Sequence, residues 1–206
     1  MRTTTVLMAM LASLASPMAW AQTNVAEGGS VALGGAAFGN SAGWDPSWGA
    51  ASPLALPSSL TDGLFLQTGQ QWNVDTVFWT GATSDVADFV TVSLGQAARI
   101  TGVTLQGDNN DTYAVDYLDL SGTWHSLASL APSSTVGHGM GMASISFAEV
   151  SATGFKVHAT SGDGFYALSE FQAFGTTAAV PEPESLALML AGLALVGASA
   201  RRRKTQ

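Results

Sequence analysis

A run of four polar residues combines two carboxylates with two amides: Asp108, Asn109, Asn110 and Asp111. Side chains of these types hydrogen-bond sugar hydroxyls, and their oxygens also ligate hard cations. Asn and Asp equally suit a tight turn, because they tolerate the left-handed backbone conformation. The run is therefore a candidate ligand-binding loop, with a plain turn as the alternative. The Gly-Asp-Gly sequence at residues 162–164 allows the same two interpretations.

Three tryptophans occur in segments rich in Gly, Pro and Ser: Trp44, Trp48 and Trp72. Aromatic faces stack on sugar rings, whereas an indole beside a strand is more often buried. Because these three tryptophans are expected in loops, we predict that they contact a ligand, with burial as the alternative.

Residues that could catalyse a reaction follow no familiar pattern. His125, His138 and His158 lack the spacing of metal ligands, and no nucleophile motif accompanies them. Carboxylates are so numerous that no pair can be singled out as acid and base. The sequence therefore predicts a protein that is not an enzyme, with a hydrolase of matrix polymers as the weakest alternative.

Short strands are the elements that must position these side chains. Residues 89–94, 113–117 and 155–159 alternate apolar and polar side chains, as strands with one buried face do. Gly-Asp and Asn-Asn pairs separate the runs at spacings expected of turns. Residues 23–175 show no convincing helical period and no internal repeat. We therefore predict an all-β fold, a β-sandwich.

The order of landmarks along the chain is more specific than the alternation. They are Asn-Val-Ala at 24–26, Leu-Thr-Asp-Gly at 60–63, Thr-Val-Phe-Trp at 76–79, Ile-Thr-Gly-Val-Thr-Leu-Gln-Gly-Asp at 100–108, Gly-x-Trp at 122–124 and Gly-Asp-Gly-x-Tyr-x-Leu-Ser-Glu-Phe at 162–171. In this order they resemble the discoidin, or coagulation-factor C-type, domain of the galactose-binding-like jelly rolls. The resemblance implies a jelly-roll β-sandwich over residues 22–176, with Trp79 and Trp124 packed inside it. The stretch between Gly63 and Trp79 is longer than is usual in that family.

The same resemblance implies a structural calcium. In the discoidin family this ion often lies where the Asp-Gly loop meets the acidic residue of the last strand, and the matching residues are Asp62 and Glu170. Calcium takes about six to eight oxygen ligands from carboxylates, carbonyls and water. The alternative is a turn aspartate beside Gly63 and a strand glutamate that faces solvent. No other cofactor is expected.

The N-terminal residues have the pattern of an export signal. A basic start at residues 1–3 precedes an apolar run at 6–14, and residues 19–21 have the small-x-small pattern that signal peptidase accepts. The apolar run is too short for a membrane span. We predict a signal peptide over residues 1–21, cleaved between Ala21 and Gln22, with a buried N-terminal helix as the alternative.

The C-terminal tail has three parts. A Pro/Glu linker at residues 177–184 contains Pro181, Glu182 and Pro183, and residues 185–200 carry no charge. The basic cluster that follows consists of Arg201, Arg202, Arg203 and Lys204. The uncharged stretch would span about 24 Å as a helix, against roughly 30 Å of hydrocarbon, a gap that bilayer thinning can close. We predict a single transmembrane helix over 185–200, with residues 201–206 in the cytoplasm and the folded part outside.

In this order the three parts resemble the PEP-CTERM sorting signal of Gram-negative bacteria. Such tails are thought to be removed near the Pro-Glu-Pro by exosortase, a membrane transpeptidase-like enzyme. The resemblance implies that signal peptidase and exosortase act on the precursor, which is held in the inner membrane at least transiently. A permanent tail anchor is the alternative.

Charge and cysteine content narrow the partners further. Between Gln22 and Val180 there are thirteen acidic residues and two basic ones, Arg99 and Lys156, which give a net charge of −11. Binding to phosphates needs clustered Lys and Arg, so no nucleic-acid partner is expected. The chain has no cysteine, and its stability must come from the core, helped by any bound ion.

These features predict an exported, non-catalytic protein of the cell surface or extracellular matrix. Its jelly-roll module is expected to bind carbohydrate, with extracellular polysaccharide as the partner, because such sorting tails are associated with exopolysaccharide-producing bacteria. The alternatives are a purely structural biofilm-matrix protein that binds no glycan and a permanently membrane-anchored surface protein.

Overall fold

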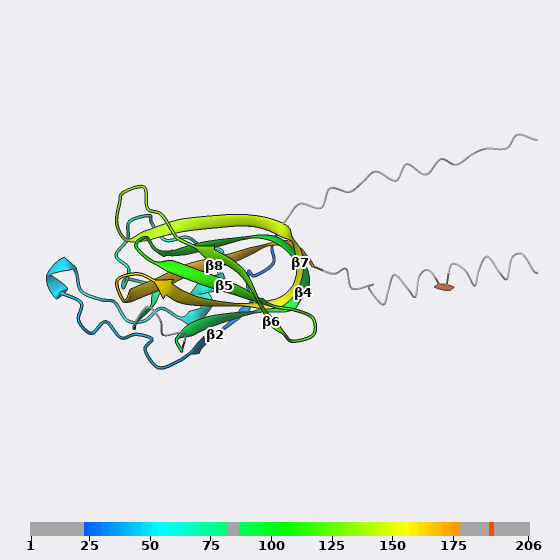
Figure 1. The fold of residues 1–206 in the computed structure, drawn as a ribbon, viewed down its shortest axis with the longest axis horizontal. Coiled ribbons are helices and arrows are strands. Elements are labelled where there is room, and N and C mark those ends of the chain that lie inside the picture. Colours follow the sequence, from blue (N-terminus) through cyan, green and yellow to red (C-terminus); the bar gives the residue numbers. More distant parts are fainter. Residues whose placement is uncertain (1–22, 82–86, 178–189, 192–206) are drawn as a thin grey trace, which may run out of the picture.

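The segments with alternating apolar and polar side chains form strands, and these strands pair in antiparallel ladders (Figure 1). The computed structural model describes residues 23–81, 87–177 and 190–191. The elements are β1 (Thr23–Asn24), β2 (Ser30–Gly34), the 3-10 helices η1 (Pro46–Trp48) and η2 (Pro57–Thr61), β3 (Val77–Thr80), β4 (Phe89–Asp108), β5 (Thr112–Leu118), β6 (Trp124–Leu130), β7 (Met140–Ser161) and β8 (Phe165–Thr177). The predicted all-β class is confirmed.

Apolar residues on one face of each predicted strand form the core. The buried members in the three predicted segments are Val90, Val92, Tyr113, Val115, Phe155, Val157 and Ala159. Their neighbours Thr91 and Lys156 are partly exposed on the other face. Removing apolar area from water stabilises the fold by about 25 cal/mol per Å², so this register is strongly favoured over a one-residue shift. These three segments are strands, as predicted.

Two long strands, β4 and β7, pass from one layer of the fold to the other. Residues 89–93 of β4 pair with β2, whereas residues 98–107 pair with β8. The ladder between β4 and β7 shifts register twice between Ser93 and Gly102, and such irregularities let a strand bend. One layer therefore contains β1, β3 and β8, and the other contains β2, β5 and β6. The result is a sandwich-like fold.

Aromatic side chains from both layers meet in the core. The ring centroids of Trp79 on β3 and Tyr113 on β5 lie 6.3 Å apart, and those of Phe155 on β7 and Phe171 on β8 lie 5.1 Å apart. All four residues are buried. Trp79 thus packs inside the sandwich, as predicted.

Trp124 does not pack inside the sandwich, and that prediction is wrong. The residue is 39% exposed at the start of β6, which is the last strand in the sheet order. Among the residues that the structure describes, no further strand pairs with the outer edge of β6. The Lys156 ammonium, 5.0 Å from the ring centroid, covers part of the indole in a cation–π contact.

The two ends of β8 lie far apart in the molecule. Phe165 begins β8 directly after the turn at residues 162–164, and Thr177 ends it opposite Ala98 in the middle of β4. Thirteen residues at about 3.3 Å each extend over about 40 Å. η1 lies at the end of the molecule where β8 begins (Figure 1).

The predicted signal peptide and nearly all of the predicted sorting tail lie outside the described residues. This applies to residues 1–22, to the Pro-Glu-Pro segment and to the basic cluster at 201–204. In the part of the chain that the structure describes, no helix has the length and apolar character needed to cross a membrane.

Candidate functional site

A pocket of about 500 Å³ opens where β4 and β7 end and β5 and β8 begin. Its lining comes from five segments that are far apart in the sequence. The lining residues are Trp44, Trp48, Gly69, Gln71, Trp72, Asp108, Asn109, Asn110, Gly137, His138, Gly139 and Asp163. We call it the tryptophan pocket. Its volume is within the range of about 300–1,000 Å³ typical of small-molecule sites.

Trp44 is at the centre of the aromatic wall. Its ring centroid lies 5.9 Å from that of Trp48, 5.4 Å from that of Trp72 and 5.5 Å from that of Phe165, each edge to face. The Trp44 Nε1–H donates to the Gly49 carbonyl at 3.0 Å, which fixes the ring. Trp72 is 3% exposed and Trp48 is 74% exposed. The wall therefore runs from a buried base to an open aromatic face.

The polar wall stands on the β4–β5 and β7–β8 turns. Asn110 Nδ2 donates to Asp163 Oδ2 at 2.8 Å and joins the two turns. Asp108, the last residue of β4, accepts from the Asn109 main-chain N–H at 2.8 Å. Asp163 also accepts from the Phe165 N–H at 2.9 Å. These bonds hold carboxylate and amide groups in place in a pocket that indoles also line.

Burial changes the acidity of two carboxyls in this wall. It raises the pKa of Asp108 to about 6, and the nearby Asp163 charge acts in the same direction. It raises the pKa of Asp111 to about 8, with repulsion from Asp108 as the second cause. The Tyr113 hydroxyl donates to Asp111 Oδ2 at 2.9 Å and partly opposes the shift. Both carboxyls therefore exchange protons near neutral pH.

A buried glutamine holds the loop that carries Trp72. Gln106 of β4 is fully buried, and its Oε1 accepts from the Leu66 N–H at 2.7 Å while its Nε2 donates to the Leu66 carbonyl at 2.9 Å. The Ser169 hydroxyl donates to the same Oε1 at 2.6 Å. This reciprocal pair ties the loop to the sheet, because an unpaired buried amide would be costly.

Gly139 brings three segments of the lining together. Its carbonyl accepts from the Asn109 N–H at 3.1 Å, and the adjacent Met140 N–H donates to the Gln70 carbonyl at 2.8 Å. Gly139 has φ 63°, and a Cβ at this position would lie 2.3 Å from the Gln70 carbonyl oxygen. Only glycine allows so close an approach at this backbone conformation.

Six of the seven residues predicted to contact a ligand line the tryptophan pocket: Trp44, Trp48, Trp72, Asp108, Asn109 and Asn110. Their role in binding stays a prediction. Asp111 does not line the pocket, since it is 2% exposed and its carboxylate accepts from Tyr113. Residues 108–111 also form a turn, in which the Asp111 N–H donates to the Asp108 carbonyl at 3.4 Å.

Gln71 and His138 line the pocket but were not predicted as site residues, whereas Asp163 lies in the Gly-Asp-Gly sequence that was predicted to form either a ligand-binding loop or a plain turn. Asp163 had a usable signal, because its Gly-Asp-Gly turn repeats the chemistry of the Asp108 loop. His138 lies in a glycine-rich segment, and no local pattern shows that this segment reaches the loop before Trp72.

The structure brings Asp62 and Glu170, the residues predicted for calcium, close enough to interact. Glu170 is fully buried, so the alternative in which it faces solvent is wrong. Burial raises its pKa to about 7, and the Asp62 and Glu27 charges raise it further. Asp62 lies in a turn, where its Oδ1 accepts from the Leu64 N–H at 2.9 Å.

One feature of the Asp62 and Glu170 pair fits a bound cation. Glu170 Oε2 is buried without a hydrogen-bond partner in the described part of the chain, an arrangement that a bound cation would satisfy. Within the same residues, no three carboxylate or imidazole side chains are grouped as metal ligands. An ion here would therefore need main-chain carbonyls and water to complete its coordination.

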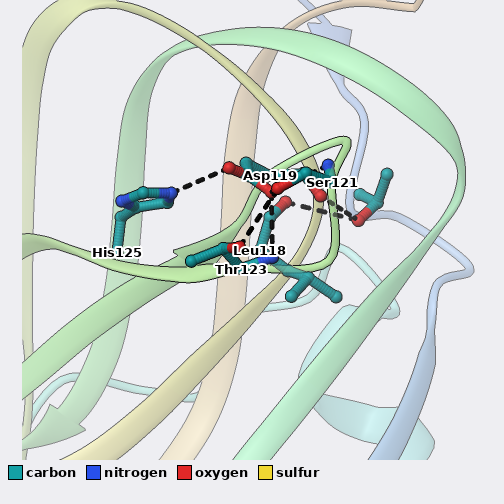
Figure 2. Close-up of polar contacts among 6 residues, drawn as sticks. Leu118, Asp119, Ser121, Thr123 and His125 are labelled. Carbon is teal, nitrogen blue, oxygen red and sulfur yellow. Dashed lines mark hydrogen bonds and ion pairs between the residues drawn. The ribbon is translucent and has the colours of Figure 1, made fainter.

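A second polar cluster fixes the β5–β6 hairpin. Asp119 Oδ1 accepts from the Ser121 N–H at 2.8 Å, the Ser121 hydroxyl at 2.7 Å and the Thr123 N–H at 2.9 Å, while Oδ2 meets His125 Nε2 at 2.8 Å (Figure 2). These bonds, the Ser121 hydroxyl first, hold the pKa of Asp119 well below its usual range. Ser121 donates to Asp119 and not to His125, so the three lack the serine–histidine bond of a catalytic triad.

Comparisons with known proteins add findings at both the tail and the folded part. Residues 179–204 match the PEP-CTERM protein-sorting motif, which confirms the predicted motif and indicates an exported protein with a C-terminal sorting signal. No curated protein matches the chain by sequence.

Several solved structures similar to this chain are carbohydrate-binding modules. Chitosan-binding module 1 of a chitosanase/glucanase from Paenibacillus sp. IK-5 is 22% identical, with a TM-score of 0.47 over 74% of this chain and 99% of that chain. The lectin domain of lectinolysin, complexed with Lewis B antigen, is 15% identical, with a TM-score of 0.49 over 75% and 98%. A Streptococcus pneumoniae fucose-binding module is 16% identical, with a TM-score of 0.46 over 75% and 96%.

Proposed function

We propose that this chain is an exported, exosortase-sorted protein of the cell surface or extracellular matrix. Its galactose-binding-like jelly-roll module binds carbohydrate without catalysing a reaction. The observation that carries the binding proposal is the tryptophan pocket, which is lined by indoles together with carboxylate and amide groups. The matched sorting motif supports export.

The pocket offers the two kinds of contact that a sugar ring needs. A sugar has an apolar face of C–H groups, which the exposed indole of Trp48 can cover, while Trp44 packs edge to face against Trp48. Its hydroxyls form hydrogen bonds with Asp108, Asn109 and Asn110. Bonds to a charged carboxylate are worth about 1.5–3 kcal/mol, so these side chains orient the ring.

A glycan array probed with the full chain in mild detergent tests the binding proposal. We expect saturable binding to one or a few polysaccharide classes. Failure to bind any glycan, with or without calcium, would contradict the proposal and favour the purely structural matrix protein.

We also propose that Asp62 and Glu170 hold a structural calcium ion. The bound ion would neutralise the buried Glu170 carboxylate, offset its repulsion from Asp62 and tie the turn after η2 to β8. The ion has no role in chemistry on a ligand. Its removal is therefore expected to lower stability first.

The fate of the tail is open to direct measurement. We propose that exosortase cleaves near Pro181–Pro183 and that the apolar stretch and the basic cluster are lost. Mass spectrometry of the protein from the cell surface or medium should then find neither. An intact peptide covering residues 201–206 on the exported protein would show a permanent anchor instead.

A further inference from the structure

Three aspartates gather behind and beside the polar wall of the tryptophan pocket. Asp108 and Asp163 line the pocket, and the buried Asp111 lies close to both, with a pKa raised to about 8 that keeps it mostly protonated at neutral pH. The three come from the end of β4, the β4–β5 turn and the β7–β8 turn. The fold therefore places two carboxylates, those of Asp108 and Asp163, at one side of the pocket.

No protein cation offsets this charge within the described residues. The only Lys and Arg there are Lys156, paired with Asp116 at 3.1 Å, and Arg99, 3.8 Å from Glu149. Neither lines the pocket. His138 does line it but forms no ion pair with these aspartates in the described structure. The same residues contain no group of three ligands that could hold a metal ion.

A buried hydrogen-bond donor in the pocket has no acceptor among the described residues. Trp72 lines the pocket and is 3% exposed, and its Nε1 is buried without a hydrogen-bond acceptor among the described residues. A buried donor without a partner costs about 1–3 kcal/mol unless a ligand or water satisfies it.

Resting on the proposed glycan binding, we propose that the tryptophan pocket selects sugars that carry a free, protonated amine, such as the glucosamine units of a de-N-acetylated polysaccharide. The ammonium donates to the carboxylates of Asp108 and Asp163, and a ring or hydroxyl oxygen accepts from the Trp72 Nε1–H. The faces of Trp44 and Trp48 add cation–π attraction to the same ammonium.

An N-acetylated sugar loses both advantages. Its amide is neutral, so it leaves the aspartate charge without a counter-charge, and its acetyl group takes the volume beside the polar wall. A neutral sugar still stacks on the indoles. It supplies no positive charge to offset the free-energy cost of desolvating the carboxylate of Asp108, which is already buried.

Calorimetric titration of the full chain with a β-1,4-linked glucosamine hexasaccharide and with its fully N-acetylated counterpart tests this selectivity. At pH 6.5 and low salt, we expect the amino form to bind at least about tenfold more tightly, a difference of one decade in Kd. High salt should reduce this preference, because it screens exposed ion pairs.

Asp108→Asn and Asp163→Asn should each reduce the preference by roughly three- to tenfold, since each removes one carboxylate and keeps the side-chain shape. Glu149→Gln is the matched control, because Glu149 is exposed and absent from the pocket lining. Two independent variants guard against misfolding of one of them.

Equal or tighter binding of the N-acetylated form, or an unchanged preference in both aspartate variants, would overturn the selectivity. Binding to neutral glycans alone would overturn it and leave glycan binding intact. Absence of binding to any glycan would overturn both.

Discussion

Trp48 is the most exposed of the large hydrophobic side chains at the pocket, with 74% of its surface accessible. An indole exposed to this degree contributes little to the stability of the free protein, so its removal should change that stability little. It buries much apolar area when a ligand covers it. Residues of this kind dominate binding energy in many interfaces. Substitution of Trp48 should therefore weaken ligand binding while it leaves the stability of the protein nearly unchanged.

Trp48→Ala is expected to weaken glycan binding by about 1–2 kcal/mol, or roughly five- to thirtyfold in Kd. Its melting temperature should change little. Leu56→Ala is the matched control, because Leu56 is also 74% exposed and does not line the pocket. Titration followed by tryptophan fluorescence measures both variants; an equal loss in the two would count against the pocket.

Asp111 gives a pH dependence of stability with a definite sign. Its pKa in the folded state is raised to about 8, so folding binds a proton that the unfolded chain releases near pH 4. This contribution to stability is full below pH 4 and is lost as the pH rises from about 4 to about 8. Asp108 and Glu170, with pKa values raised to about 6 and about 7, act in the same direction.

Urea unfolding of the wild type should therefore show a lower free energy of unfolding at pH 8 than at pH 5. Asp111→Asn should reduce this difference by roughly 2–4 kcal/mol, because the amide still accepts the Tyr113 hydrogen bond and never ionises. Glu149→Gln should leave the difference unchanged. An Asp111→Asn profile parallel to the wild type would refute the assignment.

At the scale of elements, the pocket depends on loops that approach each other closely. The loop before β7 touches the loop before Trp72 through Gly139, and it touches the β4–β5 turn through Asn109. A disturbance at this point should reach both walls of the pocket.

Gly139→Ala is expected to cost more than about 2 kcal/mol and to reduce glycan binding, because the new Cβ would meet the Gln70 carbonyl at 2.3 Å. Gly137→Ala separates this clash from simple backbone strain. Gly137 also has a positive φ, 80°, but no atom lies within 4 Å of its added Cβ, so it should cost only about 1–2 kcal/mol. Urea unfolding and glycan titration of both variants provide the comparison.

The elements that sequence predicts well are those with one buried face. Val90 and Val92 on β4 and Phe155 and Val157 on β7 show their strand period directly. The bend that carries β4 from one layer to the other has no such local signal, since it depends on pairing with β2 and β8.

The candidate site was predictable in its chemistry and not in its assembly. Residue type alone marks the Asp108 loop and the three tryptophans as candidates, but only long-range pairing brings residues 44, 72, 138 and 163 together. Asp111 could have been excluded as a pocket residue, because the strand period of two turns it inward with Tyr113. Trp124 was misplaced because its sequence position does not reveal that β6 is an edge strand.

At the scale of the whole molecule, calcium should tie an early turn to the last strand. If calcium binds, saturating ion at about 100 times its Kd adds about 2.7 kcal/mol and raises the melting temperature by several degrees. Glu170→Gln should abolish this response and, without calcium, should not lower the melting temperature, because it removes a buried carboxyl whose Oε2 has no hydrogen-bond partner among the described residues. Scanning calorimetry with calcium, magnesium or chelator tests this, and a melting temperature indifferent to all three would exclude the site.

The length of β8 has a consequence for how the protein meets its surroundings. The sorting motif begins at residue 179, two residues beyond the end of β8, while the tryptophan pocket lies beside its first residue, about 40 Å away. A molecule held at its C-terminus would thus reach outward with its pocket farthest from the support. If the tail anchors the precursor in the membrane and is later cleaved, as proposed, the pocket would be accessible to polymer in both states, and binding would not have to wait for cleavage.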